Sequence, residues 1–343
     1  MAQTTSATFG TVIPLGGTPS DIVLDESRGK LYLVNSNANR VDVYDYLNAR
    51  ALGPIAVGQR PLAAAMSMDN SYLYVTNNTS STVSVIDLNR SSLIQNVTLP
   101  AKPEGVEVGA DGRAVISTGG NGTSNLNNTL LIFDRTQPLA QQVVAVQFPP
   151  PPPTPTGLPA VQARPTTTFR GKLLRTPDGN FIIGMSVVNN SSQTVAYVYE
   201  TLSGTLLRSR FVTGQSTALS VSPDGSRFMA GFTLYDTATL AVIGQENSAN
   251  APFPLAGINN TTNVGGSVFS PDGTTIYGAF NVAPVVTPAA RPQASTLLLS
   301  DSRNLAIRLG IKLPESIIAR MVATSDGSRA WGLSESGVVS LPL

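Results

Sequence analysis

The sequence predicts an all-β, seven-bladed β-propeller of four-stranded antiparallel blades, and three observations carry that prediction. The 343-residue chain repeats one unit: an apolar run, a tight turn, a second apolar run, a polar loop and an alternating third run. An Asp-Gly turn or a close variant marks this unit seven times along the chain. The last unit lacks an outer strand, and the N-terminal segment offers one.

The most regular unit spans residues 61–88. Its apolar runs at 73–76 and 83–88 flank a loop rich in Asn, Thr and Ser, and a turn at Asp69 precedes them. Because alternation with a period of two divides side chains between the two faces of a sheet, three antiparallel strands follow from this pattern.

The turns give the size and number of the units. Asp or Asn followed by Gly supplies the positive φ that a tight hairpin needs. Seven turns in 343 residues leave about 49 residues for each unit, which suits a four-stranded blade with some enlarged loops. Stacked blades extend one core without a boundary, so residues 1–343 are predicted to form a single domain. The blade turns are expected near residues 25, 69, 111, 178, 224, 272 and 326.

The remaining strands follow from the turns. We expect second strands at 31–34, 73–76, 114–117, 181–184, 227–231, 276–279 and 329–333, and outer strands at 50–57, 93–99, 142–148, 206–212, 240–245 and 306–313. The seventh unit stops after its third strand at 337–343, whereas residues 8–15 have the character of an outer strand. Pairing of these two segments would close the ring and leave no unprotected edge in that blade.

Composition excludes several classes of function. The chain has 22 Lys and Arg against 21 Asp and Glu, without the clustered basic face that nucleic-acid binding requires. No apolar run reaches the roughly 18 to 20 residues of a membrane-spanning helix. The sequence contains no Cys and no His, which rules out disulfides, thiol catalysis and a Ser-His-Asp triad.

The segment that begins at Met1 has neither a basic region nor an apolar core typical of a signal peptide. Either the protein is cytoplasmic, or Met1 precedes a mature chain whose export signal has been removed. The low charge, the few Lys residues and the abundance of Asn, Thr and Ser favour export, so we expect an extracellular, periplasmic or cell-surface location.

Three groups of residues carry a family resemblance. Leu73-Tyr74-Val75-Thr76-Asn77, the Ser-Pro-Asp-Gly turns at 222–225 and 270–273, and Pro103-Glu104-Gly105 resemble the YVTN-repeat, lactonase-like β-propellers. The resemblance covers essentially the whole chain and implies the propeller fold. That family includes surface-layer and cell-wall proteins as well as lactonase-type hydrolases, so the resemblance implies no single activity.

Enlarged loops are the candidates for partner binding. If the first strand of each unit runs from an upper to a lower face, the turns lie on the lower face and the stretches 119–128, 149–168, 246–263 and 281–295 all emerge on the upper face. The proline-rich run at 148–159 should adopt polyproline II structure, either as a rigid spacer or as a docking surface. The candidate binding residues are Asn121, Pro151, Pro155, Asn260, Asn281 and Arg291.

The channel offers a second candidate site. Counting back from the turns places these polar residues around it: Asp21, Glu104, Glu107, Arg170, Lys172, Arg175, Thr217 and Arg320. A lactone hydrolase would use Glu104 or Asp21 as general base and Arg170 or Arg320 to hold an oxyanion. In the alternative, these side chains only pair across the mouth. Three carboxylates facing four basic residues make a poor Ca²⁺ cage, so no metal or other cofactor is predicted, with a channel Ca²⁺ as the alternative.

The preferred function is a non-catalytic, exported or cell-surface propeller that binds a protein or glycan partner through its upper face. A lactonase-like hydrolase around Asp21, Glu104, Arg170 and Arg320 is one alternative. A structural subunit of a surface array is another, and the sequence leaves the oligomeric state open.

Overall fold

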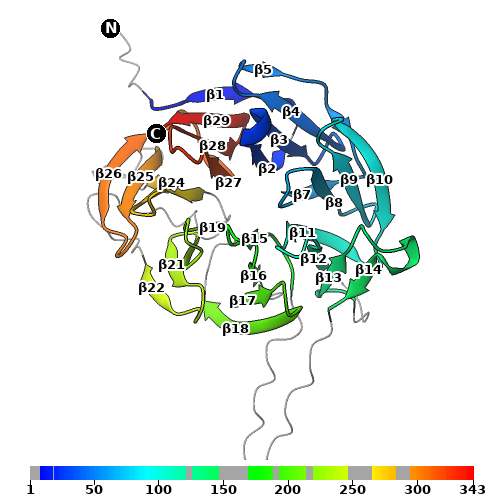
Figure 1. Ribbon diagram of the computed structural model, residues 1–343. Coiled ribbons are helices and arrows are strands. Elements are labelled where there is room, and N and C mark those ends of the chain that lie inside the picture. The colour runs from blue at the N-terminus through cyan, green and yellow to red at the C-terminus, as the bar shows by residue number, and fades with distance from the viewer. Residues whose placement is uncertain are drawn as a thin grey trace, which may run out of the picture.

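The computed structural model describes residues 8–17, 19–120, 126–146, 169–187, 193–213, 219–245, 265–282 and 294–343. Within these ranges the strands form seven antiparallel sheets, arranged as blades around a central channel (Figure 1). The predicted seven-bladed, all-β propeller is therefore confirmed.

Each blade contributes one strand at each distance from the channel. The inner strands are β2 (Pro19–Asp25), β7 (Pro61–Met66), β11 (Lys102–Val108), β15 (Leu173–Arg175), β19 (Leu219–Val221), β23 (Gly266–Phe269) and β27 (Ile317–Ala323). The second strands are β3 (Lys30–Asn35), β8 (Tyr72–Asn77), β12 (Ala114–Gly119), β16 (Phe181–Val187), β20 (Arg227–Ala230), β24 (Thr275–Val282) and β28 (Arg329–Ser334).

The third and outer strands complete the blades. The third strands are β4 (Arg40–Asp45), β9 (Thr82–Asp87), β13 (Leu130–Phe133), β17 (Gln193–Glu200), β21 (Thr233–Asp236), β25 (Ala294–Asp301) and β29 (Gly337–Pro342). The outer strands are β5 (Arg50–Ala51) with β6 (Ile55–Ala56), β10 (Ser92–Thr98), β14 (Val143–Ala145), β18 (Thr205–Thr213), β22 (Val242–Gln245), β26 (Ile307–Lys312) and β1 (Thr11–Pro14).

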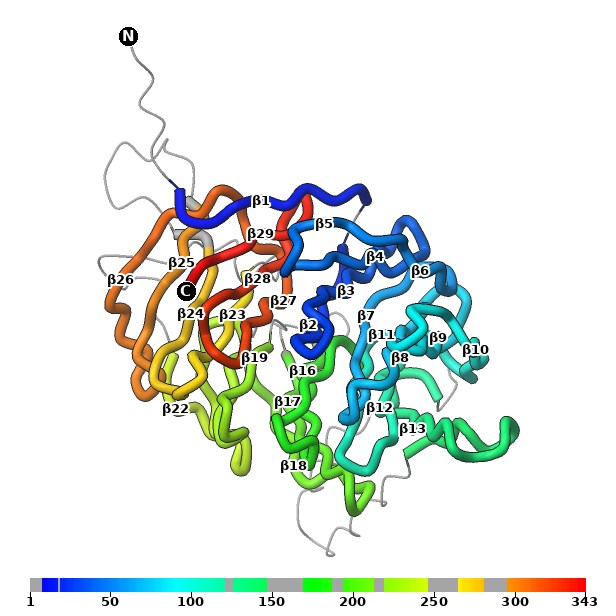
Figure 2. The backbone as a smooth tube through the Cα atoms, turned by 45° about the horizontal axis from the view of Figure 1, so that its top comes forward, coloured from blue at the N-terminus to red at the C-terminus, as the bar shows by residue number. Residues whose placement is uncertain are grey.

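The seventh blade joins the two ends of the chain. Strand β1 pairs antiparallel with β29, with Thr11 opposite Ser340 and Pro14 opposite Gly337. Both backbone views show β1 lying along β29, on the outer side of the blade (Figures 1 and 2). The predicted ring closure is confirmed.

The prediction of one continuous outer strand at 50–57 is wrong. It is interrupted, and its two halves, β5 and β6, each pair with β4. Leu52, Gly53 and Pro54 lie between them, and of these the Leu52 amide still donates to the Val43 carbonyl oxygen of β4 at 2.8 Å. Proline has no N–H to donate to a ladder, and glycine weakens a strand interior, so the pairing breaks at this point.

The core lies between neighbouring blades. Tyr74 of blade two packs edge-to-face on Phe133 of blade three, with ring centroids 5.8 Å apart. Trp331 of blade seven is 1% exposed and contacts the ring of Tyr46 from blade one at 4.7 Å. Each fully buried aromatic or aliphatic side chain contributes about 1.5–3 kcal/mol to folding, so these contacts hold the blades in a ring.

Five of the seven hairpin turns share one hydrogen-bond pattern. In blade five the hydroxyl of Ser222 donates to Asp224 Oδ1 at 2.5 Å, and the same oxygen accepts the amide of Ser226 at 3.1 Å. The backbone amide of Arg227 in turn donates to the Ser222 hydroxyl at 3.0 Å. Equivalent hydroxyl-to-carboxylate bonds join Ser67 to Asp69, Thr176 to Asp178, Ser270 to Asp272 and Thr324 to Asp326.

The turns also pack against one another around the lower face. Gly327 has a φ of +70°, and a Cβ at this position would come within 2.9 Å of the Pro271 ring in the preceding blade. Glycine is therefore required here by both backbone conformation and close approach. The Ser-Pro-Asp-Gly sequence predicted the turn at 270–273. The contact of its Pro271 with Gly327 shows that the turns also set the spacing between neighbouring blades.

Candidate functional site

The seven inner strands line the channel and share one direction, each ending at a turn on the lower face. Side chains at similar distances from the turns therefore face the channel at similar depths. Asp21, Lys172 and Arg320 each lie four residues before the residue that opens the turn. This shared register brings side chains from blades one, four and seven together.

Glu104 and Arg170 form an ion pair near the upper end of the channel. Arg170 Nη2 donates to Glu104 Oε1 at 2.7 Å, and its Nε lies 3.2 and 3.3 Å from the two carboxylate oxygens. The backbone amide of Gly171 donates to Glu104 Oε2 at 2.8 Å. The hydrogen bond to Glu104 raises the pKa of Arg170. Both oxygens of this carboxylate therefore already accept hydrogen bonds, which is unfavourable for a general base.

Asp21 anchors the middle of the channel. The residue is 1% exposed, and its carboxylate accepts hydrogen bonds from the backbone amides of Ile22 at 3.0 Å and Ala64 at 3.1 Å. Lys172 Nζ lies 3.2 Å from Asp21 Oδ2 and also donates to the carbonyl oxygens of Ser20 and Leu62. Burial lowers the pKa of Lys172, and the Asp21 carboxylate opposes that shift. This cluster ties blades one, two and four together.

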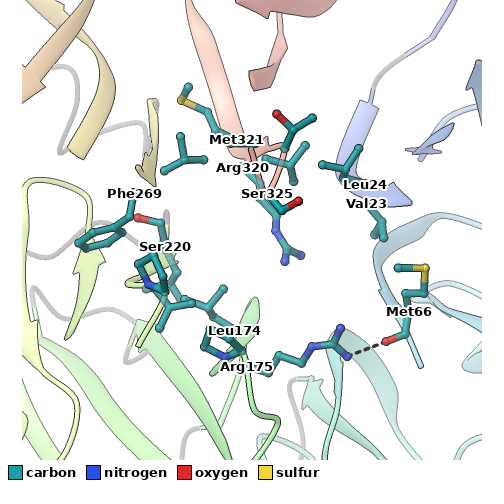
Figure 3. Close-up of a pocket in the computed structure, with 18 of the residues that line it drawn as sticks. Val23, Leu24, Met66, Leu174, Arg175, Ser220, Phe269, Arg320, Met321 and Ser325 are labelled. Carbon is teal, nitrogen blue, oxygen red and sulfur yellow. Dashed lines mark hydrogen bonds between the residues drawn. The ribbon is translucent and has the colours of Figure 1, made fainter. Parts of the chain in front are cut away.

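Glu107 lies between two arginines on the lower side of this cluster. It is 2% exposed, with Arg320 Nη2 at 3.5 Å from its Oε1 and Arg175 Nε at 4.0 Å from its Oε2. Burial raises the pKa of Glu107, while the two guanidinium groups act in the opposite direction. Arg175 also crosses the channel and donates through Nη1 to the carbonyl oxygen of Met66 at 2.7 Å (Figure 3).

A cavity of about 530 Å³ opens below these charges. Its rim includes Pro177, Pro223 and Pro271, which belong to hairpin turns, so it opens on the lower face. Arg320 lies further from the turn along its strand, at the inner end of the cavity, where it contacts Glu107, and Figure 3 shows the Arg320 guanidinium projecting toward the middle of the ring. The walls are largely apolar and come from six blades: Val23, Met66, Leu174, Val221, Phe269 and Met321.

The four residues predicted for a hydrolase do not form one site. Glu104 pairs with Arg170 at the upper end, whereas Asp21 lies 3.9 Å from Arg320 in the middle of the channel. Among the described residues no ion pair joins these two groups. Of the four, only Arg320 lines the lower cavity.

The cavity itself is absent from the sequence-based candidates, although Glu107 and Arg175 were among the polar channel positions. Its walls are formed by residues that come one to three positions before the turn, such as Met66, Leu174 and Phe269. The positions of these residues relative to the turns can be read from the sequence. The sequence does not indicate that their apolar side chains leave an open space between them.

The predicted partner-binding residues Asn121, Pro151, Pro155, Asn260 and Arg291 lie outside the described residues, as does Thr217. Asn281 belongs to β24, where it pairs with Ser295 across the ladder. The upper-face binding surface therefore stays a prediction.

No group of three or more Asp and Glu that could hold a metal ion occurs in the described part of the chain. The channel carboxylates instead face cations, with Asp21 against Lys172 and Glu107 against two arginines. This arrangement does not fit a Ca²⁺ cage, which needs several oxygen ligands free to converge on the ion. No helix of the described residues is both long and apolar enough to cross a membrane.

Comparisons with known proteins bear on the fold. No family model and no curated protein matches the chain. Hydrazine synthase of Kuenenia stuttgartiensis is similar in structure, with a TM-score of 0.65 and 18% identity, covering 100% of this chain and 99% of the other. The β-propeller domain of Cps50 (Swd1) of Myceliophteria thermophila has a TM-score of 0.66 and 11% identity, covering 98% of this chain and 99% of the other.

At these identities the similarity shows the propeller fold and nothing of activity. Membership of the YVTN-repeat, lactonase-like family stays a prediction from the motifs.

Proposed function

We propose that this protein is a non-catalytic binding propeller, and that the lower mouth of its channel is a ligand site. One observation carries the proposal: the channel acids are held in ion pairs and backbone hydrogen bonds, while an apolar-walled cavity of about 530 Å³ stays open beneath them. Cavities of roughly 300–1,000 Å³ with a few converging polar groups are typical of small-molecule sites.

The carboxylates support binding over hydrolysis. A general base needs a lone pair within reach of the proton that it removes. Glu104 uses both oxygens on Arg170 and Gly171, and Asp21 is buried against Lys172 and two amides. The lactonase-like alternative has no comparable observation in its favour.

The export expected from composition belongs to this proposal, as does a protein or glycan partner at the upper loops. The cavity opens at the hairpin turns, and the upper loops are predicted at the other end of the strands. A partner at the upper face and a ligand in the cavity would therefore not compete for the same residues.

The lower-face site is tested with the neutral fluorophore N-phenyl-1-naphthylamine, whose emission rises in apolar surroundings. Leu24 lines the cavity, so Leu24→Trp should fill part of it and abolish probe binding. Leu309 lies on outer strand β26 and is 48% exposed, so Leu309→Trp is the matched control and should bind like the wild type. Equal binding by both variants, with unchanged circular dichroism, would refute the lower cavity as the site.

A further inference from the structure

The charges at the inner end of the cavity do not balance. Arg175, Arg320 and Glu107 line this end, and the pair of Lys172 and Asp21 lies next to Arg320 in the channel, which makes three cations and two acids. Asp21 forms an ion pair with Lys172 at 3.2 Å, and Glu107 forms ion pairs with both arginines. One positive charge is therefore in excess at a place where most of the surrounding wall is apolar.

Arg320 has the weakest hydrogen bonds and ion pairs of these cations. A guanidinium carries five N–H donors. Within the described residues, its ion-pair contacts are Glu107 at 3.5 Å and Asp21 at 3.9 Å, both longer than the 2.7–2.9 Å of a strong charge-assisted bond. Its side chain is 26% exposed and projects into the cavity (Figure 3). An incoming acceptor would find free N–H groups there.

The acids near the cavity do not block an anion. Glu107 is 2% exposed and covered by Arg175 and Arg320, so its charge is offset on the side that faces the cavity. Glu26 keeps its negative charge but lies at the rim, in the turn after β2, where its two oxygens accept bonds from the Ser325 amide and hydroxyl at 2.7 Å each. Charge complementarity therefore favours a negative group at the inner end and an apolar body toward the opening.

We infer that the cavity binds an organic anion, a carboxylate or sulfonate on an apolar body, with the anionic group against Arg320 and the body along Leu174, Phe269 and Met321. This inference rests on the proposed function, because it assigns a ligand class to the same site. It also distinguishes the two mouths of the channel, since at the upper end Arg170 already has its carboxylate partner in Glu104.

The test uses two probes that share one aromatic skeleton. 8-Anilino-1-naphthalenesulfonate carries a sulfonate that N-phenyl-1-naphthylamine lacks. The wild type should bind the sulfonate more tightly than the neutral probe, and Arg320→Gln should weaken sulfonate binding on the order of tenfold or more while changing neutral binding little. Arg308→Gln removes an exposed arginine from β26 with the same change in net charge and should leave both affinities unchanged.

Arg320→Lys, which keeps the charge but loses the fork of donors, should retain part of the sulfonate preference. Added salt should weaken wild-type sulfonate binding and leave neutral binding unaffected, and this measurement needs no variant that must fold. If both probes bind equally and Arg320→Gln changes neither, the anion class is wrong and the site stands. If neither probe binds the wild type, or Leu24→Trp blocks neither, the proposed site itself fails.

Discussion

At Gly119 the absence of a side chain leaves room for the ion pair between Glu104 and Arg170. A Cβ on Gly119 would lie 2.0 Å from Glu104 Oε1 and 2.5 Å from its Cδ. The glutamate end could move away only by giving up its bonds to Arg170 and to the Gly171 amide. Glycine at this point in β12 is therefore a requirement of the pair and not of the local backbone.

Gly119→Ala should lower the free energy of unfolding by about 1–3 kcal/mol, because it displaces a part-buried, charge-assisted pair. Chemical denaturation measures the change. In the Glu104→Ala background the side chain that would clash is absent, so Gly119→Ala should lower the free energy of unfolding much less there. An equal loss of stability in both backgrounds would show that the new methyl group clashes with another residue.

Residue positions were predicted well where the turn set the register. Asp21 and Lys172 were both placed in the channel by counting back from the turns, and they meet at 3.2 Å. The reach of Arg175 to the Met66 carbonyl could not be predicted, because it depends on a long side chain crossing to another blade. Rotamers of such side chains are chosen by the surrounding structure and not by local sequence.

In the hairpin turns, the local sequence determines the structure of a whole element. The hydroxyl and backbone hydrogen bonds within the turns lower the pKa of Asp224 and Asp326 from 3.8 to about 2. The pKa values of Asp69, Asp178 and Asp272 are also lowered, with the hydroxyl two residues earlier as the largest cause. The turn sequence thus predicts both the bend and the ionisation state that holds it.

The folded protein should lose stability in acid through these turns. A carboxyl whose folded pKa lies below its unfolded value stabilises the fold fully above about pH 4, and that contribution disappears as pH falls toward about 2. Asp224→Asn should therefore be less stable than the wild type at pH 6, with the difference closing near pH 2. Melting temperatures across this range measure it, and the effect should be small because the carboxyl is partly solvated.

Ser222→Ala provides the control, because it removes the hydroxyl that donates to Asp224. Asp224→Asn should change the pH dependence less in this background than in the wild type. A difference between Asp224→Asn and wild type that stays constant from pH 6 to pH 2 would contradict the account.

At the scale of the whole molecule, the ring depends on a four-residue strand. Strand β1 covers the edge of β29, and its Ile13 packs beside the buried cluster that includes Trp331 and Leu333. Without β1 the unpaired N–H and C=O groups of β29 would face solvent or another chain. Ring closure therefore contributes to both stability and solubility.

Deleting residues 1–14 should lower the melting temperature by about 5 °C or more and promote self-association, because one blade loses its outer strand and exposes an edge. Differential scanning calorimetry and light scattering measure the two effects. Deleting residues 1–7 leaves every paired residue of β1 in place and should preserve the melting temperature. Equal behaviour of the two truncations would show that β1 does not hold the ring closed.

The sequence by itself determined the number of blades and the position of the turns, because hairpins are local and their Asp-Gly signals and period-two alternation are readable from neighbouring residues. It also determined the closing strand, because the last unit lacks an outer strand that the N-terminal segment supplies. Only the tertiary structure decided which channel charges meet, and that Glu104 is committed while Arg320 is exposed to a cavity. These facts depend on side chains from blades far apart in the chain, whose distances are fixed by the ring. The open space beneath Arg320 exists only once all seven inner strands surround it.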